Sequence, residues 1–360
     1  MEQVIQRFSE QIRTAAGNRQ PLRIRGGGTK DWYGQSLTGD ILDTRGYSGI
    51  IDYDPTELVI TARCGTPLAE LESLLAQQNQ MLAFEPPHFG VDATVGGMVA
   101  AGLSGPRRQA VGSVRDFVLG TTIMDSRGQI LHFGGRVMKN VAGYDVSRLM
   151  AGSMGVLGLI LDVSLKVLPR PTIETTVRLQ SGQADAIRRL NQWGGQPLPI
   201  SASLWHDDTL LVRLSGARSA VGTAQAMLGG DVVDNVANEA DAIWEAVREQ
   251  RHPFFVGPPA ASCWRLSVAS TAPPIPLPGE QLLEWGGALR WLRADGGIGA
   301  DQIRAAARQA GGHATLFRGG DREQGVFHPL APAVAAIHRK LKQGFDPECI
   351  FNPGRMYNDI

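Results

Sequence analysis

The segment RGGGTK at residues 25–30 decides how this sequence is interpreted. Leu22 and Ile24 lead directly into it, which is typical of a strand that feeds a glycine loop. Glycine adopts positive φ freely and lets the main chain approach a ligand closely, so consecutive glycines can direct several backbone N–H groups at one anion. Thr29 adds a hydroxyl group and Lys30 a positive charge. The segment favours a site for a phosphate-bearing ligand over the flexible turn that the same composition also allows.

Two further glycine segments follow, TVGGMVAAG at residues 94–102 and GSMGVLG at residues 152–158. The first consists of small residues where a buried segment usually carries large apolar ones, and a flat ring system or ribityl chain packed on bare main chain explains that difference. The sequence contains neither G-x-G-x-x-G between a strand and a helix nor G-x-x-x-x-G-K-[ST]. The glycines therefore predict a nucleotide site that is neither a Rossmann site nor a P-loop.

Charge and composition exclude several classes of partner. Lys plus Arg and Asp plus Glu number 35 each among 360 residues, so no long-range field of either sign would attract nucleic acid or an anionic membrane. The most apolar stretch, residues 156–167, contains charged residues and is shorter than the roughly 20 residues of a spanning helix, so we expect no transmembrane segment. No secretory signal is indicated. We expect a cytoplasmic location, with association to the inner membrane face only through partners.

Cysteine and histidine spacing gives no sign of a metal site. Cys64, Cys263 and Cys349 are too few and too far apart to hold an iron–sulfur cluster on four local thiolates. No pair of histidines in the second half of the chain has the H-x-H or i, i+4 spacing of a local metal site, so we predict none. If electrons pass through this chain, an organic cofactor must carry them.

Hydrophobic periodicity and turn residues predict the order of elements. We expect a helix near residues 2–16, a hairpin of residues 117–125 and 129–133, a long strand over residues 156–168 and a C-terminal helix through Val334, Ile337 and Leu341. The prolines at 169 and 171 end the long strand, and six of the seven tryptophans follow them, which implies a second core. We therefore expect domains at 1–171 and 172–325, with residues 326–360 as a helix and tail that return to the first domain.

Four segments in chain order resemble the FAD-binding domain of the vanillyl-alcohol oxidase and p-cresol methylhydroxylase superfamily: residues 24–30, 93–102, 112–120 and 152–160. KNVAGYD at residues 139–145 and the tail FDPECIFNPGRM at residues 345–356 further resemble the small FAD-binding (E) subunits of glycolate oxidases. The resemblance implies an α+β fold, in which a two-lobed FAD-binding domain of the p-cresol methylhydroxylase type carries a smaller α+β cap domain. It also implies FAD as the cofactor.

The resemblance assigns individual residues to the cofactor. They are Arg25, Gly26, Gly27, Gly28, Thr29, Lys30, Thr94, Gly96, Gly97, Gly102, Gly112, Arg115, Asp116, Gly155, Gly158 and Ile160. Residues 26–29 would hold the pyrophosphate through backbone N–H groups, and the third segment would contact the adenosine or ribityl part. Arg115 and Asp116 would lie beside the cofactor, although a surface ion pair is an equal alternative. Because residues 25–30 contain no His or Cys for attachment, we expect FAD to be bound non-covalently.

Catalytic residues are less evident than cofactor residues. Oxidation of a 2-hydroxy acid requires a cation for the carboxylate, a base for the hydroxyl proton and a hydride acceptor. His313 and Arg318 are weak candidates for base and anchor, and a strand with solvated polar ends is the more favoured interpretation of that stretch. The loop after Gly319 also departs from the E-H-G type of sequence that catalytic relatives carry there, which puts independent turnover in doubt.

The resemblance implies a subunit that takes part in oxidising glycolate or a similar 2-hydroxy acid to the 2-oxo acid, with electrons passing through FAD. Its partners would be a larger flavin subunit and an iron–sulfur subunit. Two alternatives stay open. One is a stand-alone FAD-linked oxidase or dehydrogenase of another alcohol or hydroxy acid, and the other is a mainly structural subunit with a vestigial flavin site.

Overall fold

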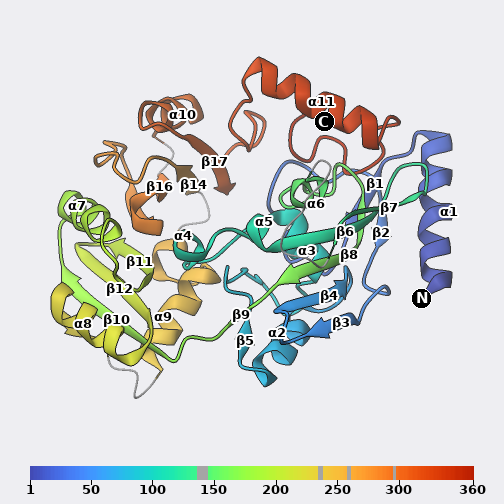
Figure 1. Ribbon diagram of the computed structural model, residues 1–360. Helices are drawn as coiled ribbons and strands as arrows, with labels where there is room; N and C mark the ends of the chain where they lie inside the picture. The colour runs from blue at the N-terminus through green and yellow to red at the C-terminus, as the bar shows by residue number, and fades with distance from the viewer. Residues whose placement is uncertain (136–144, 234–237, 258–260, 295–296) are drawn as a thin grey trace. The chain divides into compact units, whose positions relative to one another are not determined.

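The computed structural model describes residues 1–135, 145–233, 238–257, 261–294 and 297–360. Of the segment KNVAGYD at residues 139–145, only Asp145 falls within this description. The chain forms two compact units (Figure 1). The first comprises residues 1–103, 112–169 and 329–360, and the second comprises residues 104–111 and 170–328. The expected division of the chain into domains at residues 1–171 and 172–325 stays a prediction.

A five-stranded antiparallel sheet in the order β3-β4-β8-β6-β7 forms the centre of the first unit. Its strands are β3 (Ile50–Asp54), β4 (Val59–Arg63), β6 (Val118–Met124), β7 (Ile130–Gly134) and β8 (Leu159–Lys166). The inner strands β4 and β8 are buried along most of their length, whereas none of the residues of the edge strands β3 and β7 is fully buried. This difference follows from position, because an inner strand has neighbours on both sides and an edge strand meets water.

Shorter elements surround this sheet. They are α1 (Glu2–Asn18), β1 (Leu22–Arg25), β2 (Asp40–Asp43), α2 (Leu68–Gln77), β5 (Gln80–Met81), α3 (Val95–Ala101), α5 (Val114–Phe117), α6 (Val146–Leu149), β9 (Leu168–Pro169) and α11 (Pro332–Phe345). β1 and β2 pair in parallel, and β5 pairs with β9. Helix α1 buries Phe8, Ile12 and Ala15, which the helical period places on one face. Of these elements, β1 contributes most directly to the position of the glycine loop, because residues 26–30 follow it in the chain.

The second unit is built on an eight-stranded antiparallel sheet in the order β13-β10-β12-β11-β15-β16-β14-β17. Its elements are α4 (Arg108–Val111), β10 (Ile173–Gln180), α7 (Gln183–Gly194), β11 (Ile200–His206), β12 (Thr209–Gly216), α8 (Arg218–Leu228), β13 (Asp231–Val232), α9 (Glu239–Arg248), η1 (Pro253–Phe255), β14 (Ser262–Ser267), β15 (Glu280–Glu284), η2 (Trp285–Gly287), β16 (Leu289–Ala294), α10 (Ala300–Gln309) and β17 (His313–Arg318). Two apolar clusters lie in it, one containing Trp193 and Trp205 and the other containing Trp264. The expected second core is therefore present.

The segment Ser104–Val111 belongs to the second unit although it lies within the sequence expected to form the first domain. The indole Nε1 of Trp285 donates to the Gly105 carbonyl at 3.0 Å, and the Arg107 guanidinium pairs with the Glu174 carboxylate at 2.6 Å. The Arg108 guanidinium lies 4.4 Å from the centre of the Trp285 ring. A cation over an aromatic face and an ion pair between a buried arginine and a partly exposed glutamate fix this short segment in the second unit.

Most expected elements of the first unit are confirmed. The helix near residues 2–16 is α1, the hairpin is β6 and β7 with a turn closed by the bond from the Gly128 N–H to the Asp125 carbonyl, and the C-terminal helix is α11. The long strand expected over residues 156–168 was too long. It begins only at Leu159, because Gly155 and Gly158 have φ of 74° and 154° and form a turn before it.

Truncation of a core isoleucine tests the central sheet. Ile60 of β4 is fully buried, whereas Ile51 of β3 is 38% exposed. We expect Ile60→Ala to lower the free energy of unfolding by about 2–5 kcal/mol, because it removes buried methyl groups and leaves a cavity. Ile51→Ala should change it by no more than about 0.5 kcal/mol. Denaturant unfolding of both variants measures the difference, and equal losses would contradict the placement of β4 in the core.

Candidate functional site

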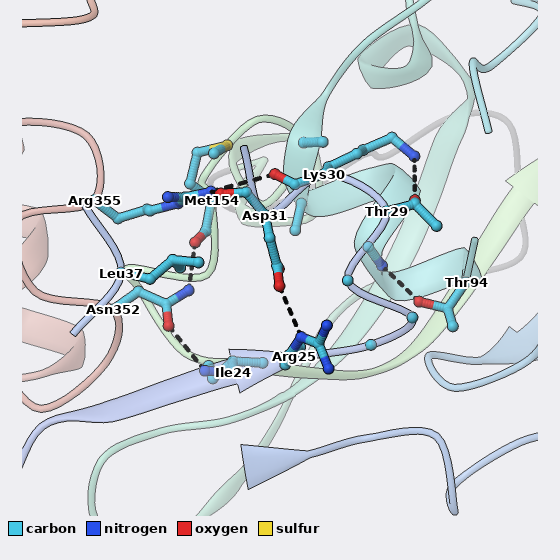
Figure 2. A pocket seen from close by; sticks show the side chains of 16 residues that line it. Ile24, Arg25, Thr29, Lys30, Asp31, Leu37, Thr94, Met154, Asn352 and Arg355 are labelled. Carbon is cyan, nitrogen blue, oxygen red and sulfur yellow. Dashed lines mark hydrogen bonds and ion pairs between the residues drawn. The ribbon is translucent and has the colours of Figure 1, made fainter. Parts of the chain in front are cut away.

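A cavity opens where β1 ends and the glycine loop begins (Figure 2). It contains about 560 Å³ of atom-free space, part of it open to solvent. Its walls are Ile24, Arg25, Gly26, Gly27, Gly28, Thr29, Lys30, Asp31, Leu37, Thr94, Gly97, Ala100, Ala101, Met154, Asn352 and Arg355. We call it the loop cavity. All of its lining residues belong to the first unit, so this unit contains the candidate site by itself.

A second cavity of about 400 Å³ continues from the first, and we call it the inner cavity. Its walls are Ile24, Gly26, Thr44, Cys64, Gly96, Gly97, Ala100, Met154, Gly155, Gly158, Leu159, Ile160 and Asn352. The two cavities share Ile24, Gly26, Gly97, Ala100, Met154 and Asn352. They therefore form one cleft with a charged, loop-lined end and an apolar, glycine-lined end. Such a cleft suits a ligand that is itself anionic in one part and apolar in another.

The glycine loop lies too close to its neighbours to carry side chains. A Cβ atom on Gly27 would lie 1.5 Å from the Asp92 carbonyl oxygen, and one on Gly26 would lie 2.3 Å from the Thr94 hydroxyl oxygen. Gly28 has a φ of 73°, in the left-handed region that favours glycine. The close approach of Gly26 and Gly27 to residues 92–94, and the backbone conformation of Gly28, thus require glycine. Bare main chain forms the cavity wall there.

The loop cavity carries more positive than negative charge. Arg25, Lys30 and Arg355 line it together with a single carboxylate, that of Asp31. This carboxylate accepts from Arg25 Nε at 2.8 Å and also pairs with Arg23. Lys30 Nζ donates to the His88 carbonyl at 3.1 Å. The surplus of cations beside bare main chain fits a diphosphate, because both N–H dipoles and cations stabilise negative charge.

The second glycine segment forms the short helix α3 beside the cleft. The Thr94 side chain caps this helix by accepting from the Gly97 N–H at 3.3 Å. The Gly96 N–H donates to the Cys64 carbonyl at 2.8 Å, and a Cβ on Gly96 would lie 2.6 Å from that of Cys64. The small residues therefore let α3 pack directly on the end of β4. They also leave room in the inner cavity.

Two side chains from the C-terminal tail complete the cleft, and the sequence analysis did not assign them to it. Asn352 Oδ1 accepts from the Ile24 N–H at 2.8 Å, and its Nδ2 donates to the Met154 carbonyl at 2.7 Å. The Arg355 guanidinium donates to the Asp31 carbonyl at 2.9 Å and to the Lys30 carbonyl at 3.3 Å (Figure 2). The available signal was the conspicuous Asn-Pro-Gly-Arg sequence in the tail.

The structure brings twelve of the sixteen expected cofactor residues to the walls of this cleft. They are Arg25, Gly26, Gly27, Gly28, Thr29, Lys30, Thr94, Gly96, Gly97, Gly155, Gly158 and Ile160. Their contact with a cofactor stays a prediction.

The other four, Gly102, Gly112, Arg115 and Asp116, line neither cavity. Gly102 and Gly112 adopt positive φ where the chain leaves the first unit and returns to it. Arg115 donates to the Ala151 carbonyl at 3.3 Å, and Asp116 caps α5 by accepting from the Ser113 N–H at 2.7 Å.

The candidate catalytic residues His313 and Arg318 lie in the second unit, at the two ends of β17. Five residue steps along a strand separate their Cα atoms by roughly 16 Å. The His313 ring lies 6.3 Å from that of His328, and Arg318 lies opposite Cys263 in the sheet. The structure does not bring the two candidates together as a base and an anchor for one small substrate.

Comparison with known proteins begins with the first unit. Residues 5–134 match the family described as an FAD binding domain. Over 355 residues the chain is 49% identical to glycolate oxidase subunit GlcE of Escherichia coli K12, and the match covers 99% of this chain and 98% of that protein. Glycolate oxidase subunit GlcD of Bacillus subtilis is 31% identical over 163 residues, and D-lactate dehydrogenase of Archaeoglobus fulgidus is 33% identical over 153 residues. These two matches cover 44% and 42% of this chain and 34% of each longer protein.

A solved structure of alkyldihydroxyacetonephosphate synthase has the same fold, with a TM-score of 0.63 over 96% of this chain and 73% of that one. At 15% identity this likeness concerns the fold alone. Together with the FAD binding domain it confirms the expected α+β fold, with an FAD-binding domain of the p-cresol methylhydroxylase type.

Substitution of Gly27 tests the glycine loop. Gly27→Ala places a methyl group where the Asp92 carbonyl oxygen lies, so the loop must move and we expect the Kd for FAD to rise by more than about tenfold, the size of a 1.4 kcal/mol loss. Gly17→Ala in α1 is the control, because a Cβ there has no neighbour within 4 Å. Titration of apoprotein with FAD, followed by flavin fluorescence, measures both. Unchanged affinity in Gly27→Ala would remove this loop from the site.

Thiol reactivity tests the inner cavity. Burial, aided by the nearby Asp162 carboxylate, raises the pKa of the Cys64 thiol to about 12, and burial raises the pKa of Cys263 to about 12. Only the thiolate is nucleophilic, so at pH 8 roughly one molecule in ten thousand is reactive at each site. Cys349 is exposed. We expect iodoacetamide at pH 8 to label Cys349 in the folded protein and to label the other two only after unfolding, as peptide mass spectrometry would show. Rapid labelling of Cys64 in the native protein would contradict its burial.

Proposed function

This chain belongs to the family of glycolate oxidase subunit GlcE, and we propose that it is the FAD-binding subunit of a glycolate oxidase. In that role it takes part in the oxidation of glycolate or a similar 2-hydroxy acid to the 2-oxo acid, with electrons passing through FAD. The observation that carries the proposal is 49% identity over almost the whole of both chains. The partial matches to GlcD and to D-lactate dehydrogenases support the same substrate class, since all of these names refer to 2-hydroxy acids.

The cleft supports the proposal through the chemistry of its walls. In our assignment the backbone of residues 26–28 and the cations Arg25, Lys30 and Arg355 hold the pyrophosphate. Gly158 and Ile160 in the inner cavity provide an apolar surface for a ring or sugar. FAD, when bound, supplies the acceptor for the two electrons of the hydroxy acid. The protein's own contribution is to bind and orient that group and to shield part of it from water.

The assignment includes non-covalent attachment. Cys64 is the cysteine that lines the inner cavity, and burial raises the pKa of its thiol to about 12. A thiol held in its protonated form is a poor nucleophile toward a flavin ring.

The proposal includes partner subunits. The relative that matches along its whole length is named as a subunit, so the activity belongs to an assembly of more than one chain. We propose a larger flavin subunit and an iron–sulfur subunit as the partners. This chain has three cysteines, fewer than the four thiolates of a common cluster, so a partner must supply any iron–sulfur relay.

The proposed location of the chain also depends on its partner subunits. Among the described residues, none of the helices combines the length and the apolarity that crossing a bilayer demands. We propose that the chain works in the cytoplasm, at the inner membrane face, where its partners hold it.

Flavin analysis of the purified chain tests the proposed function. We expect the protein to bind FAD, to show the visible absorbance of an oxidised flavin and to release all of it as free FAD on heat denaturation, because the attachment is non-covalent. Addition of glycolate to this chain alone should leave the flavin oxidised, whereas the complete assembly should oxidise glycolate to the 2-oxo acid and reduce an added electron acceptor by two electrons.

Other outcomes separate the alternatives. Flavin that stays with the precipitated protein would contradict non-covalent attachment. Bleaching of the flavin by glycolate in the isolated chain would favour a stand-alone oxidase. A chain that binds no FAD would favour a structural subunit with a vestigial site.

A further inference from the structure

A buried ion pair lies directly behind the tail residues of the cleft. Lys342 of α11 and Asp346, which follows the helix, approach within 2.8 Å, and their side chains are 3% and 0% exposed. Lys342 is the one buried residue of α11, whose apolar Ile337 is 57% exposed. A helix that buries a lysine while it exposes an isoleucine is not held by ordinary hydrophobic packing.

The hydrogen bonds of this pair are complete. Besides Asp346, the Lys342 ammonium donates to the carbonyls of Val156 and Phe351, each at 2.8 Å. Its three N–H donors thus have three acceptors. The Asp346 carboxylate accepts from the Ile350 N–H at 3.1 Å and from the Phe351 N–H at 2.8 Å. Removing two charges from water is costly, and replacement by apolar residues often stabilises a protein, so this pair calls for a reason other than stability.

Both segments that the pair joins continue into walls of the cleft. Val156 lies between Met154 and Gly158, which line it, and Phe351 directly precedes Asn352, which lines both cavities. The Leu22 N–H donates to the Ile350 carbonyl at 2.7 Å and the Asn352 N–H donates to the Leu22 carbonyl at 2.9 Å. Residues 350–352 therefore run beside β1 like an added strand, and Asn352 reaches both β1 and the third glycine segment.

We propose that Lys342 and Asp346 are positioning residues for the FAD cleft, which act by fixing the place of Asn352. The pair holds the main chain at Phe351 and Val156 at a set distance from each other. Asn352, which follows Phe351, bonds to Ile24 of β1 and to Met154, so its position sets the distance between those two segments. This spacing is the width of the cleft where the two cavities meet. The inference rests on the proposed FAD function and adds to it how the site is kept open and shaped.

The experiment compares two paired replacements, each of which joins one residue of α11 to an aspartate that follows the helix. Lys342→Met with Asp346→Asn removes the buried pair without leaving a lone charge. Arg339→Met with Asp359→Asn is the matched control, because that pair is joined at 2.7 Å but its side chains are 56% and 55% exposed. We expect the buried replacement to raise the Kd of the full-length apoprotein for FAD about tenfold, the lower end of what supporting groups behind a ligand usually contribute. The exposed replacement should leave the Kd unchanged.

Asn352→Ala completes the test, because it keeps both ions and removes the link through which they are proposed to act. It should also raise the Kd about tenfold, and combining it with the buried replacement should weaken binding no more than about twofold further, as expected for groups that act as a unit. The visible circular dichroism of bound flavin should change in the same way in both.

Three results would overturn the proposal: an unchanged Kd in Asn352→Ala, fully multiplicative effects in the combined variant, or an equal loss in the exposed control. A buried replacement that does not fold would show that the pair holds the fold rather than the cleft, and would also overturn the proposal. If the unaltered protein binds no FAD, the proposed function fails instead, so the two failures are distinguishable.

Discussion

The structure of the candidate site depends on one close approach of main chain to main chain. Gly26 and Gly27 run so near to residues 92–94 that a single methyl group on Gly27 would collide with the Asp92 carbonyl. The loop can therefore face the cleft with main chain rather than side chains, and Gly96 in the first turn of the neighbouring α3 likewise lets that helix pack on Cys64. Strand β1 leads into the loop, and its pairing with β2 on one side and with the tail at Phe351 on the other holds it in place. If residues 26–28 moved away from residues 92–94, their main chain would no longer form this wall of the cleft.

Charged side chains add a modest positive potential to a cavity whose shape is set by the main chain. Asp31 contributes a carboxylate to a cavity that is otherwise suited to anions, but two arginines share that carboxylate. The ion pair holds the Arg25 side chain in place, and the Asp31 carboxylate offsets part of the positive potential of that side chain. Arg355, from the tail, adds a further positive charge to the cavity. The cleft thus has a modest local field, which agrees with a chain whose overall charge is balanced.

The local parts of this site could be predicted from sequence, and the distant parts could not. The loop at 25–30 was recognisable because three glycines after a strand have few structural uses, and the small residues at 94–102 stood out against the bulk expected of a buried segment. The Asn-Pro-Gly-Arg sequence made the tail conspicuous, but nothing in it indicated that the side chains of Asn352 and Arg355 reach the cleft. Their role comes from contacts across 328 and 324 positions of the chain. Gly102 and Gly112 line neither cavity, and their positive φ has local reasons: Gly102 ends α3 and lies against Gly152, and Gly112 lies against the Asp116 side chain.

The position of Asn352 also bears on when the protein can acquire its cofactor during synthesis. The ribosome makes β1 and the glycine loop early, yet the side chain that ties them to the third glycine segment is added 328 residues after Ile24. A nascent chain that has completed its central sheet still lacks one wall of the cleft. A chain that stalls before residue 352 would therefore leave the ribosome without the side chain that joins Ile24 to Met154, and its cleft would lack that wall.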